Sequence, residues 1–284
     1  MSQYTHNCYE LVAEVRRAIK DHSTAKVQGT DTSGPFTNEI IIKYINDAQK
    51  FLFDILFARQ RHLFLTSTTI TGSSSVYTLP ADFFKLRLFE TSDRVQIHPI
   101  PVTQRHLNDD DGSKYLYYRY GKSLRVDKDS LGDINTLWYY TRPRQITMGK
   151  VQTGGALSMT LATTARKEAD YYNDMYIEDI TADFSSEISD YSAARVATVA
   201  QTAGTADFYG IVSELPEELH HLIGRRAVIL MKTLPDAPIL GIGLSKLETD
   251  LFMQDLTESI RSLCGDADDE TMEEIILNME PFIP

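Results

Sequence analysis

Cysteine is scarce in this sequence, and long apolar runs are missing altogether. The 284 residues contain two cysteines, Cys8 and Cys264, which lie far apart and lack the spacing of metal ligands. Isolated thiols suit a reducing compartment, where they are usually small buried apolar side chains. No apolar run approaches the roughly 20 residues that cross a bilayer, and residues 1–10 lack the basic and apolar regions of a signal peptide. We therefore expect a protein that is made in a cytoplasm and has no membrane partner.

Basic residues are absent from the end of the chain. Residues 266–284 contain seven Asp or Glu and no Lys or Arg, and the net charge of the whole chain is −12. Residues 1–265 therefore carry −5. Because no basic patch is visible, specific recognition of nucleic acid is not expected. A surface that repels DNA suits a place where DNA slides past without sticking.

Catalytic and metal-binding patterns are also missing. His220 and His221 are adjacent, unlike the i, i+4 pairs that bind metals from one helix face, and are interpreted as surface or capping side chains. The Asp-Asp-Asp-Gly run at 109–112 lacks the ligand spacing of a calcium loop. The run at 241–246 lacks the glycine spacing of a phosphate loop, and no nucleophile elbow is present. The sequence therefore indicates a non-enzymatic protein without metal or cofactor.

Helices are predicted at both ends of the chain, where apolar residues recur at helical spacing. They cover Tyr9–Lys20, Asn38–Arg61, a segment opened by Leu215-Pro216-Glu217-Glu218, and Ile239–Leu263, with Gly265 placed to cap the last. The second helix has one continuous apolar stripe, formed by Ile41, Tyr44, Ile45, Ala48, Phe51, Leu52 and Ile55.

Between the helices the apolar period becomes that of strands. Strands are expected at 63–71, 75–78, 85–91, 95–100, 115–120, 123–126 and 136–141. Gly72-Ser73-Ser74 is expected to join the first two as a hairpin, and Gly121-Lys122 to join 115–120 to 123–126. Aromatic residues are frequent in the later strands, at Tyr115, Tyr117, Tyr118, Tyr120 and Trp138-Tyr139-Tyr140. A sheet with one face in the core explains them, and a platform that stacks on sugars or bases is the alternative.

A second β block is predicted over 150–212, flanked by Gly- and Thr-rich runs that look like linkers. Its strands are expected at 157–161, 175–180, 187–191 and 195–199. Terminal helices with strands between them indicate an α+β protein, in which the N- and C-terminal helices form a bundle and the antiparallel β region and the small β block project from it. The expected domains are 1–149 with 213–265, an inserted module at 150–212, and an acidic tail at 266–284.

The acidic tail contains apolar side chains that a purely solvated segment does not need. They are Ile275, Ile276, Leu277, Met279, Phe282 and Ile283. We interpret the tail as a docking segment that is mobile in the monomer and orders on another protein. The alternative is a fraying acidic terminus that aids solubility.

Three motifs of the chain resemble the head-to-tail adaptors of tailed bacteriophages. Thr37–Lys50 looks like the first helix of those proteins, and Tyr77–Phe83 (Tyr-Thr-Leu-Pro-Ala-Asp-Phe) looks like the turn that follows a strand in them. Leu215–Leu219 resembles the start of their C-terminal helix. In the second β block, Tyr172–Ile177, Ile188–Tyr191 and Arg195–Val199 are similar to a small β module of phage virion proteins, although Asp174 replaces its usual glycine and Ala182–Ser186 its glycine-rich loop.

The resemblance implies a virion structural protein of the connector, or head-completion, type, like tail tubular protein A. Such a protein forms a twelvefold ring in the neck, below the portal, where it extends the DNA channel and provides the platform for tail attachment. The expected partners are the portal protein, the tail or nozzle proteins of the phage, and further copies of the chain. The acidic tail at 266–284 would bind either the portal protein or a neighbouring copy. During genome ejection DNA would pass through without specific binding. The alternatives are another tail or baseplate structural protein, or a carbohydrate-binding or hydrolytic tail protein.

Overall fold

A computed structural model describes residues 6–29, 33–71, 76–104, 116–126, 134–235 and 244–264. The chain is an α+β protein, as the sequence predicts, and divides into two compact units. Residues 1–56 and 143–284 form the first unit, and residues 57–142 form the second. The second unit therefore interrupts the first in sequence.

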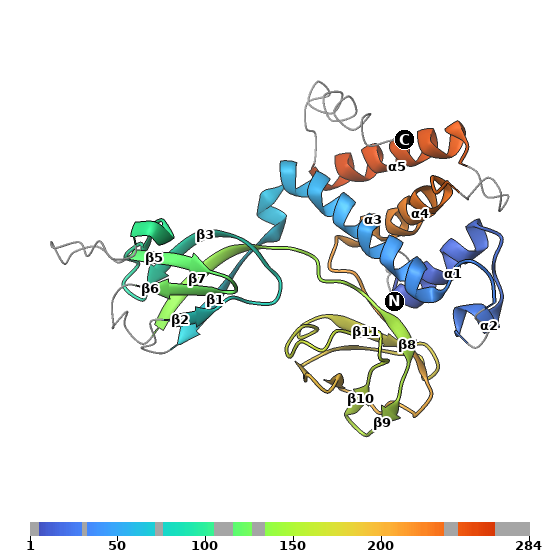
Figure 1. The fold of residues 1–284 in the computed structure, drawn as a ribbon, viewed down its shortest axis with the longest axis horizontal. Coiled ribbons are helices and arrows are strands. Elements are labelled where there is room, and N and C mark those ends of the chain that lie inside the picture. The colour runs from blue at the N-terminus through green and yellow to red at the C-terminus, as the bar shows by residue number, and fades with distance from the viewer. Residues whose placement is uncertain are drawn as a thin grey trace. The chain divides into compact units, whose positions relative to one another are not determined.

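The helices of the first unit come from both ends of the chain (Figure 1). They are α1 (Cys8–Ala18), α2 (Thr24–Val27), α3 (Asn38–Arg59, whose last turn belongs to the second unit), α4 (His220–Lys232) and α5 (Lys246–Cys264), with a 3-10 turn at Glu217–Leu219 before α4. α1 packs against α4, and α4 packs against α5. Asn7 caps α1 and forms a capping box with Glu10, whose side chain reaches back to the cap.

The last helix begins later than its apolar pattern predicts. The expected start was Ile239, but Leu244 and Ser245 are not helical and α5 begins at Lys246. The Ser245 backbone N–H donates to Glu248 Oε2 at 3.0 Å, and the Glu248 backbone N–H donates to Ser245 Oγ at 3.3 Å. This reciprocal pair is a capping box, a stronger start signal than the apolar pattern. Gly265 lies outside the described residues.

The buried face of α3 is rotated slightly from the predicted stripe. Ile41, Ile45, Ala48 and Leu52 are buried as predicted. Tyr44, Phe51 and Ile55 are only half-buried. Gln49, Phe53 and Leu56 are buried in addition. A polar Gln49 is stable on this face because both ends of its amide find hydrogen-bond partners, which are described below.

The second unit contains two sheets around one core. One has the strand order β1 (Leu65–Thr71), β7 (Ile134–Thr141), β3 (Phe83–Thr91), and the other β2 (Val76–Thr78), β6 (Ser123–Val126), β5 (Leu116–Tyr120), β4 (His98–Pro99). 3-10 turns cover Arg61–Phe64 and Val102–Gln104. Buried side chains of both sheets and of the segments beside them form a single cluster: Tyr77, Leu79, Phe89, Ile97, Leu124, Val126, Leu137 and Tyr139.

Two pairings in this unit differ from the predicted ones. The hairpin predicted between 63–71 and 75–78 is wrong, because β1 pairs with β7 and β2 pairs with β6. The predicted antiparallel arrangement also has an exception, since β4 pairs with β5 in parallel. The hairpin around Gly121 and Lys122 is confirmed, with β5 antiparallel to β6.

The second β block contains more strands than were predicted and forms two four-stranded sheets. Their orders are β13-β14-β10-β9 and β12-β11-β15-β8. The strands are β8 (Met148–Lys150), β9 (Thr153–Gly154), β10 (Ser158–Thr160), β11 (Tyr176–Asp179), β12 (Phe184–Glu187), β13 (Asp190–Tyr191), β14 (Val196–Thr198) and β15 (Phe208–Ile211). The strand expected at 187–191 is divided between β12 and β13, and Asp174 adopts a left-handed φ of 65°, as its place in a glycine position predicts.

Three buried tyrosines form the centre of this block. The rings of Tyr172 and Tyr191 meet edge to face at 4.8 Å, and Tyr209 is fully buried. Each hydroxyl has a backbone partner: Tyr209 accepts from the Ala162 N–H at 3.0 Å, Tyr172 accepts from the Arg166 N–H, and Tyr191 donates to the Arg166 carbonyl. Burial raises the pKa of Tyr191 to about 12. The block thus has a core of its own.

The same block also contacts the first helix closely. Asn7 forms a β-bridge with Val212, and its side-chain amide donates to Glu178 of β11. A Cβ on Gly210 would lie 2.5 Å from Asn7 Oδ1 and 2.8 Å from the Tyr9 nitrogen. Only glycine permits this approach of α1 to β15. The second β block therefore belongs to the compact unit of the helices.

Candidate functional site

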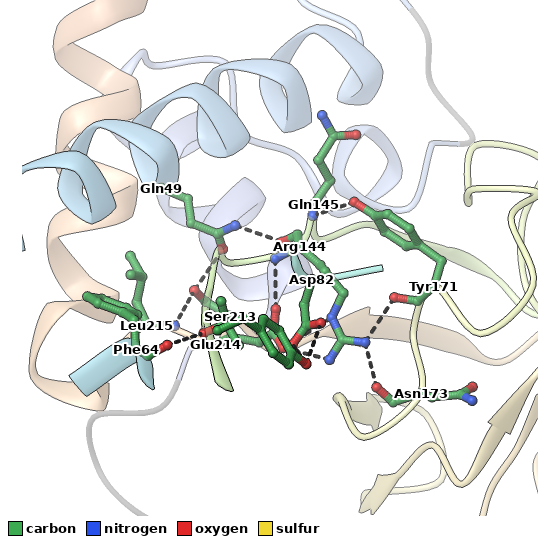
Figure 2. Close-up of polar contacts among 12 residues, drawn as sticks. Gln49, Phe64, Asp82, Arg144, Gln145, Tyr171, Asn173, Ser213, Glu214 and Leu215 are labelled. Carbon is green, nitrogen blue, oxygen red and sulfur yellow. Dashed lines mark hydrogen bonds and ion pairs between the residues drawn. The ribbon is translucent and has the colours of Figure 1, made fainter. Parts of the chain in front are cut away.

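Arg144 and Glu214 lie at the two ends of the second β block and hold them together (Figure 2). Arg144 Nη2 is 2.6 Å from Glu214 Oε1, and the Arg144 backbone N–H donates to Glu214 Oε2 at 2.7 Å. Arg144 Nη1 also donates to the carbonyls of Tyr171 and Asn173, at 3.1 and 2.6 Å. Only 8% of the Arg144 side chain is exposed. The guanidinium is thus matched by one carboxylate and two carbonyls, as a buried charge requires.

Two polar side chains of α3 bind the segment that leads into the block. Gln49 Nε2 donates to the Arg144 carbonyl at 2.8 Å, and Gln49 Oε1 accepts from Ser213 Oγ at 2.7 Å. One turn earlier, Asn46 Oδ1 accepts from the Ile146 N–H at 2.8 Å, and Asn46 Nδ2 donates to the Ile146 carbonyl at 3.0 Å. We call Asn46, Gln49, Arg144, Ser213 and Glu214 the polar joint. It fixes the entry and exit of the β block to α3.

Two grooves of the first unit flank these elements. A groove of about 450 Å³ lies between α3 and the loop before β11, and is lined by polar residues that include Lys43, Asp47, Thr164 and Arg166. A smaller groove of about 200 Å³ lies between α1, α4 and α5, with Val228, Ile229, Leu251 and Phe252 among its apolar lining.

A comparison with protein-family models decides what kind of protein carries this joint. The model described as SU10 adaptor protein matches residues 7–153, a little over half of the chain. The chain belongs to the SU10 adaptor protein family. The match runs from the cap of α1 to β9 and includes the Thr37–Lys50 and Tyr77–Phe83 motifs. A comparison with curated proteins gives no match.

Membership of the SU10 adaptor family makes this chain a structural adaptor protein of a bacteriophage, and hence a virion component with phage head or tail proteins as partners. The family is a structural one, typically without enzymatic activity. None of the described helices is both long and apolar enough to span a membrane.

The predicted docking residues of this SU10 adaptor, which are Ile275, Ile276, Leu277, Met279, Phe282 and Ile283, lie outside the described residues. The same is true of the Asp-rich run at 109–112, of the glycines at 241 and 243, and of Tyr115. Among the residues that are described, no group of three or more His, Cys, Asp or Glu is placed to hold a metal ion.

The prediction that both adjacent histidines are surface or capping residues is wrong for His220. Its side chain is 1% exposed. Nδ1 accepts from the His6 backbone N–H at 3.3 Å, so the ring proton is on Nε2, which donates to the Leu215 carbonyl at 2.8 Å. Burial lowers the pKa of His220, which favours the neutral ring that this arrangement requires. His220 therefore holds the start of α4 to the chain before α1.

Cys8 behaves as the sequence predicts. Its side chain is fully buried, and desolvation by burial raises the pKa of the thiol well above its ordinary value. A protonated buried thiol is a poor nucleophile. The side chain of Cys264 lies outside the described part of the structure.

The aromatic residues of the second unit divide between the core and the surface, as the core interpretation predicts. Tyr139 is buried in the core and Tyr117 packs against it. Trp138 is half-buried and donates its indole N–H to Glu90 Oε1 at 2.9 Å. Tyr118 and Tyr120 lie on the other face of β5, where Tyr120 is 61% exposed.

Sequence reasoning missed the polar joint, although a signal was present. Asn46 and Gln49 lie three residues apart on the otherwise apolar face of α3, a spacing that places both on one side of a helix. Polar residues at such positions need buried partners. The partners themselves are distant in sequence, so only the fold identifies them.

Proposed function

We propose that this SU10 adaptor is a head-to-tail adaptor whose copies form a ring below the portal, in the neck of the virion. Twelve copies would match the ring that the motif resemblance implies. The ring would extend the DNA channel and provide the platform on which tail or nozzle proteins attach. The observation that carries the proposal is the family match over residues 7–153, because it covers α1, α3 and the whole second unit.

The proposed mechanism is assembly on a template. The chain would stay monomeric alone and form a ring only on a portal of matching symmetry, as expected for a protein without a self-sealing coiled-coil pattern. DNA would pass through the ring during genome ejection without sequence-specific contacts, in keeping with the net charge of −12.

The proposal gives each part of the chain a role. The helices of the first unit would form the bundle of the ring, and residues 150–212 would be a β module inserted in it. The tail at 266–284 would dock on the portal or on a neighbouring copy through Ile275, Ile276, Leu277, Met279, Phe282 and Ile283. Each large apolar side chain that is fully covered would contribute roughly 1.5–3 kcal/mol. Ordering the backbone costs about 1–2 kcal/mol per residue, so only a close-fitting groove makes docking favourable.

Electron microscopy of negatively stained mixtures tests the ring. The purified protein is first checked by light scattering, which should give the mass of a monomer at micromolar concentration. It is then mixed with purified portal protein. Rings stacked on the portal are the expected result. Tubes that form without portal would instead indicate a tail-tube protein, and the absence of both would overturn the adaptor proposal.

A further inference from the structure

The charge of this chain is segregated, which the net value of −12 conceals. Residues 57–142, which form the second unit, contain twelve Lys or Arg and nine Asp or Glu, and so carry +3. The rest of the chain contains 16 Lys or Arg and 31 Asp or Glu, and so carries −15. The second unit is therefore a cationic part of an acidic protein.

The tip of the β5–β6 hairpin concentrates this positive charge. Arg119, Lys122 and Arg125 lie within seven residues, all three are exposed, and no Asp or Glu occurs from Leu116 to Val126. Gly121 forms the turn with a φ of +59°, and nothing lies within 4 Å of where its Cβ would be. The tip is thus open to solvent.

The guanidinium groups at the tip lie over aromatic rings. Arg125 Cζ is 5.3 Å from the centre of the Tyr120 ring, and Arg119 Cζ is 5.2 Å from the centre of the Phe83 ring. Arg119 also donates from Nε to the Gly121 carbonyl at 3.2 Å. A ring orders a guanidinium without neutralising its charge, and leaves N–H edges able to donate.

No carboxylate of the described residues forms an ion pair with Arg119 or Arg125. Three arginines of the first unit, Arg16, Arg144 and Arg225, instead pair with Asp21, Glu214 and Asp255. The charges of Arg119 and Arg125 are therefore not balanced by a neighbouring acid in the part of the chain that the structure describes.

The register places two tyrosines beside Arg125 on one face of the sheet, whereas Arg119, opposite Leu124, lies on the other face. Tyr118 is opposite Arg125, and Tyr120 is opposite Ser123. Directly opposed residues share a face, and the alternate pair Tyr117 and Val126 faces the core. The outer face of β5 and β6 therefore presents Arg125, Tyr118 and Tyr120 together.

We propose that the tip of the β5–β6 hairpin binds the phosphate backbone of double-stranded DNA, independently of its sequence. Arg119, Lys122 and Arg125 would each contact a phosphate, and the Tyr120 hydroxyl could donate to another oxygen. A planar guanidinium matches the geometry of a phosphate, and such contacts carry no sequence information. The inference draws its setting from the proposed function, in which DNA passes the ring. Contacts at one small tip would hold DNA weakly and so permit it to move.

Duplex DNA fits this tip better than the acidic β block of a second copy does. That block, residues 150–212, contains nine Asp or Glu and four Lys or Arg. Four of the nine carboxylates already accept hydrogen bonds within their own unit: Asp170, Glu178, Asp179 and Asp207. The phosphates of DNA, by contrast, are evenly spaced and turned toward solvent.

The salt dependence of DNA binding tests the proposal. Binding of the full-length protein to a labelled 20-base-pair duplex is measured by anisotropy from 25 to 200 mM NaCl, with two unrelated duplex sequences. The triple variant Arg119→Gln, Lys122→Gln, Arg125→Gln removes three cations from the tip. The matched control Arg17→Gln, Lys43→Gln, Lys50→Gln removes three exposed cations from the first unit.

The expected result is binding at low salt with the same affinity for both sequences. The slope of log K against log salt should fall by about 2.7 in the tip variant, at about 0.9 for each lost phosphate contact, and stay unchanged in the control. No binding at 25 mM, or equal losses in both variants, would overturn the proposal. So would unchanged DNA binding in a tip variant that no longer stacks on the portal, which would assign the tip to a protein interface.

The outcomes for the ring and for the hairpin are separable. The tip variant should still stack on the portal, because its three side chains are not part of the first unit. If wild-type protein binds DNA through the tip but forms no ring on the portal, the ring proposal fails and this inference stands. If rings form and the tip variant binds DNA as wild type does, the ring proposal stands and this inference fails.

Discussion

Arg144 and Glu214 are 70 residues apart in sequence, and their ion pair joins the two ends of the second β block. Glu214 is 29% exposed and Arg144 only 8%. Because Arg144 is the more buried partner, the loss of Glu214 should destabilise the protein more than the loss of Arg144 would through the unpaired Glu214 carboxylate.

We expect Glu214→Gln to destabilise the protein by about 3 kcal/mol, because it leaves a buried guanidinium without its carboxylate. Urea unfolding followed by circular dichroism measures the change. Asp255→Asn is the control: it breaks the more exposed pair of Asp255 with Arg225 and should cost less than about 1 kcal/mol. Equal losses in the two variants would contradict the importance of the polar joint.

Gly210→Ala should destabilise the protein by about 1–3 kcal/mol, because the new Cβ meets the Asn7 side chain and the backbone nitrogen of Tyr9. Gly224→Ala is a matched control in α4. The three atoms nearest to its Cβ all belong to the flexible carboxylate of Glu14, and alanine favours a helix by about 0.5–1 kcal/mol, so the change should be near neutral. Thermal unfolding compares the two, and a neutral Gly210→Ala would show that α1 does not pack closely on β15.

Acidification should weaken the contact made by His220. Its folded pKa is lowered by burial, so its contribution to stability is present above the ordinary pKa of histidine and is lost as pH falls through the lowered folded value. Protonation of Nδ1 would also break the bond from the His6 N–H. The free energy of unfolding of wild type relative to His220→Gln should therefore shrink between pH 7.5 and pH 5.

An NMR titration provides the direct reading of this group. The His220 ring should titrate below the usual pKa of about 6.5. His6, Glu217 and Glu218 lie close enough to influence it. A His220 that titrates at or above the usual value would contradict the buried, neutral ring.

Replacing residues 150–212 with a short Gly/Ser linker should leave a first unit that still unfolds cooperatively. The block has its own tyrosine core, which supports this expectation. The variant should nevertheless unfold at a lower urea concentration than wild type, because Asn7 loses Glu178 and Arg144 loses two carbonyl partners. Loss of all cooperative unfolding would show that the block is part of the main core.

Truncation after Gly265 tests the tail. The shortened chain should keep its fold, as its circular dichroism would show, but should no longer co-sediment with portal. A second variant of full length, which keeps the acids but replaces Ile276, Leu277 and Phe282 with Ser, separates apolar docking from charge. Unchanged co-sedimentation in both variants would leave the tail with no docking role.

The parts of the fold that depend on near neighbours could be predicted from the sequence. The α3 helix follows from its apolar stripe, and the β5–β6 hairpin follows from Gly121 and Lys122. The pairing of β1 could not, because its partner β7 is far along the chain and the intervening Gly-Ser-Ser run favours a local hairpin. Local turn signals mislead where a distant strand competes for the same edge.

The same distinction applies to the site. The partners of Gln49 are 95 and 164 residues away, so its burial could not be read from its own surroundings. Charge segregation was missed for another reason. A net charge averages over the chain, and the cationic hairpin becomes visible only when Phe57–Arg142 is known to be a separate unit.

Trp138 is the single tryptophan of the chain, and it lies in β7 of the second unit with its indole N–H bonded to Glu90. Its emission therefore reports on residues 57–142 alone, whereas four of the α-helices, and most of α3, belong to the other unit. Unfolding of the second unit can therefore be followed by tryptophan fluorescence, and unfolding of the helices by circular dichroism, without any added label. Coincident transitions in the two signals would show that the first and second units unfold together, and separate transitions would show that they unfold independently.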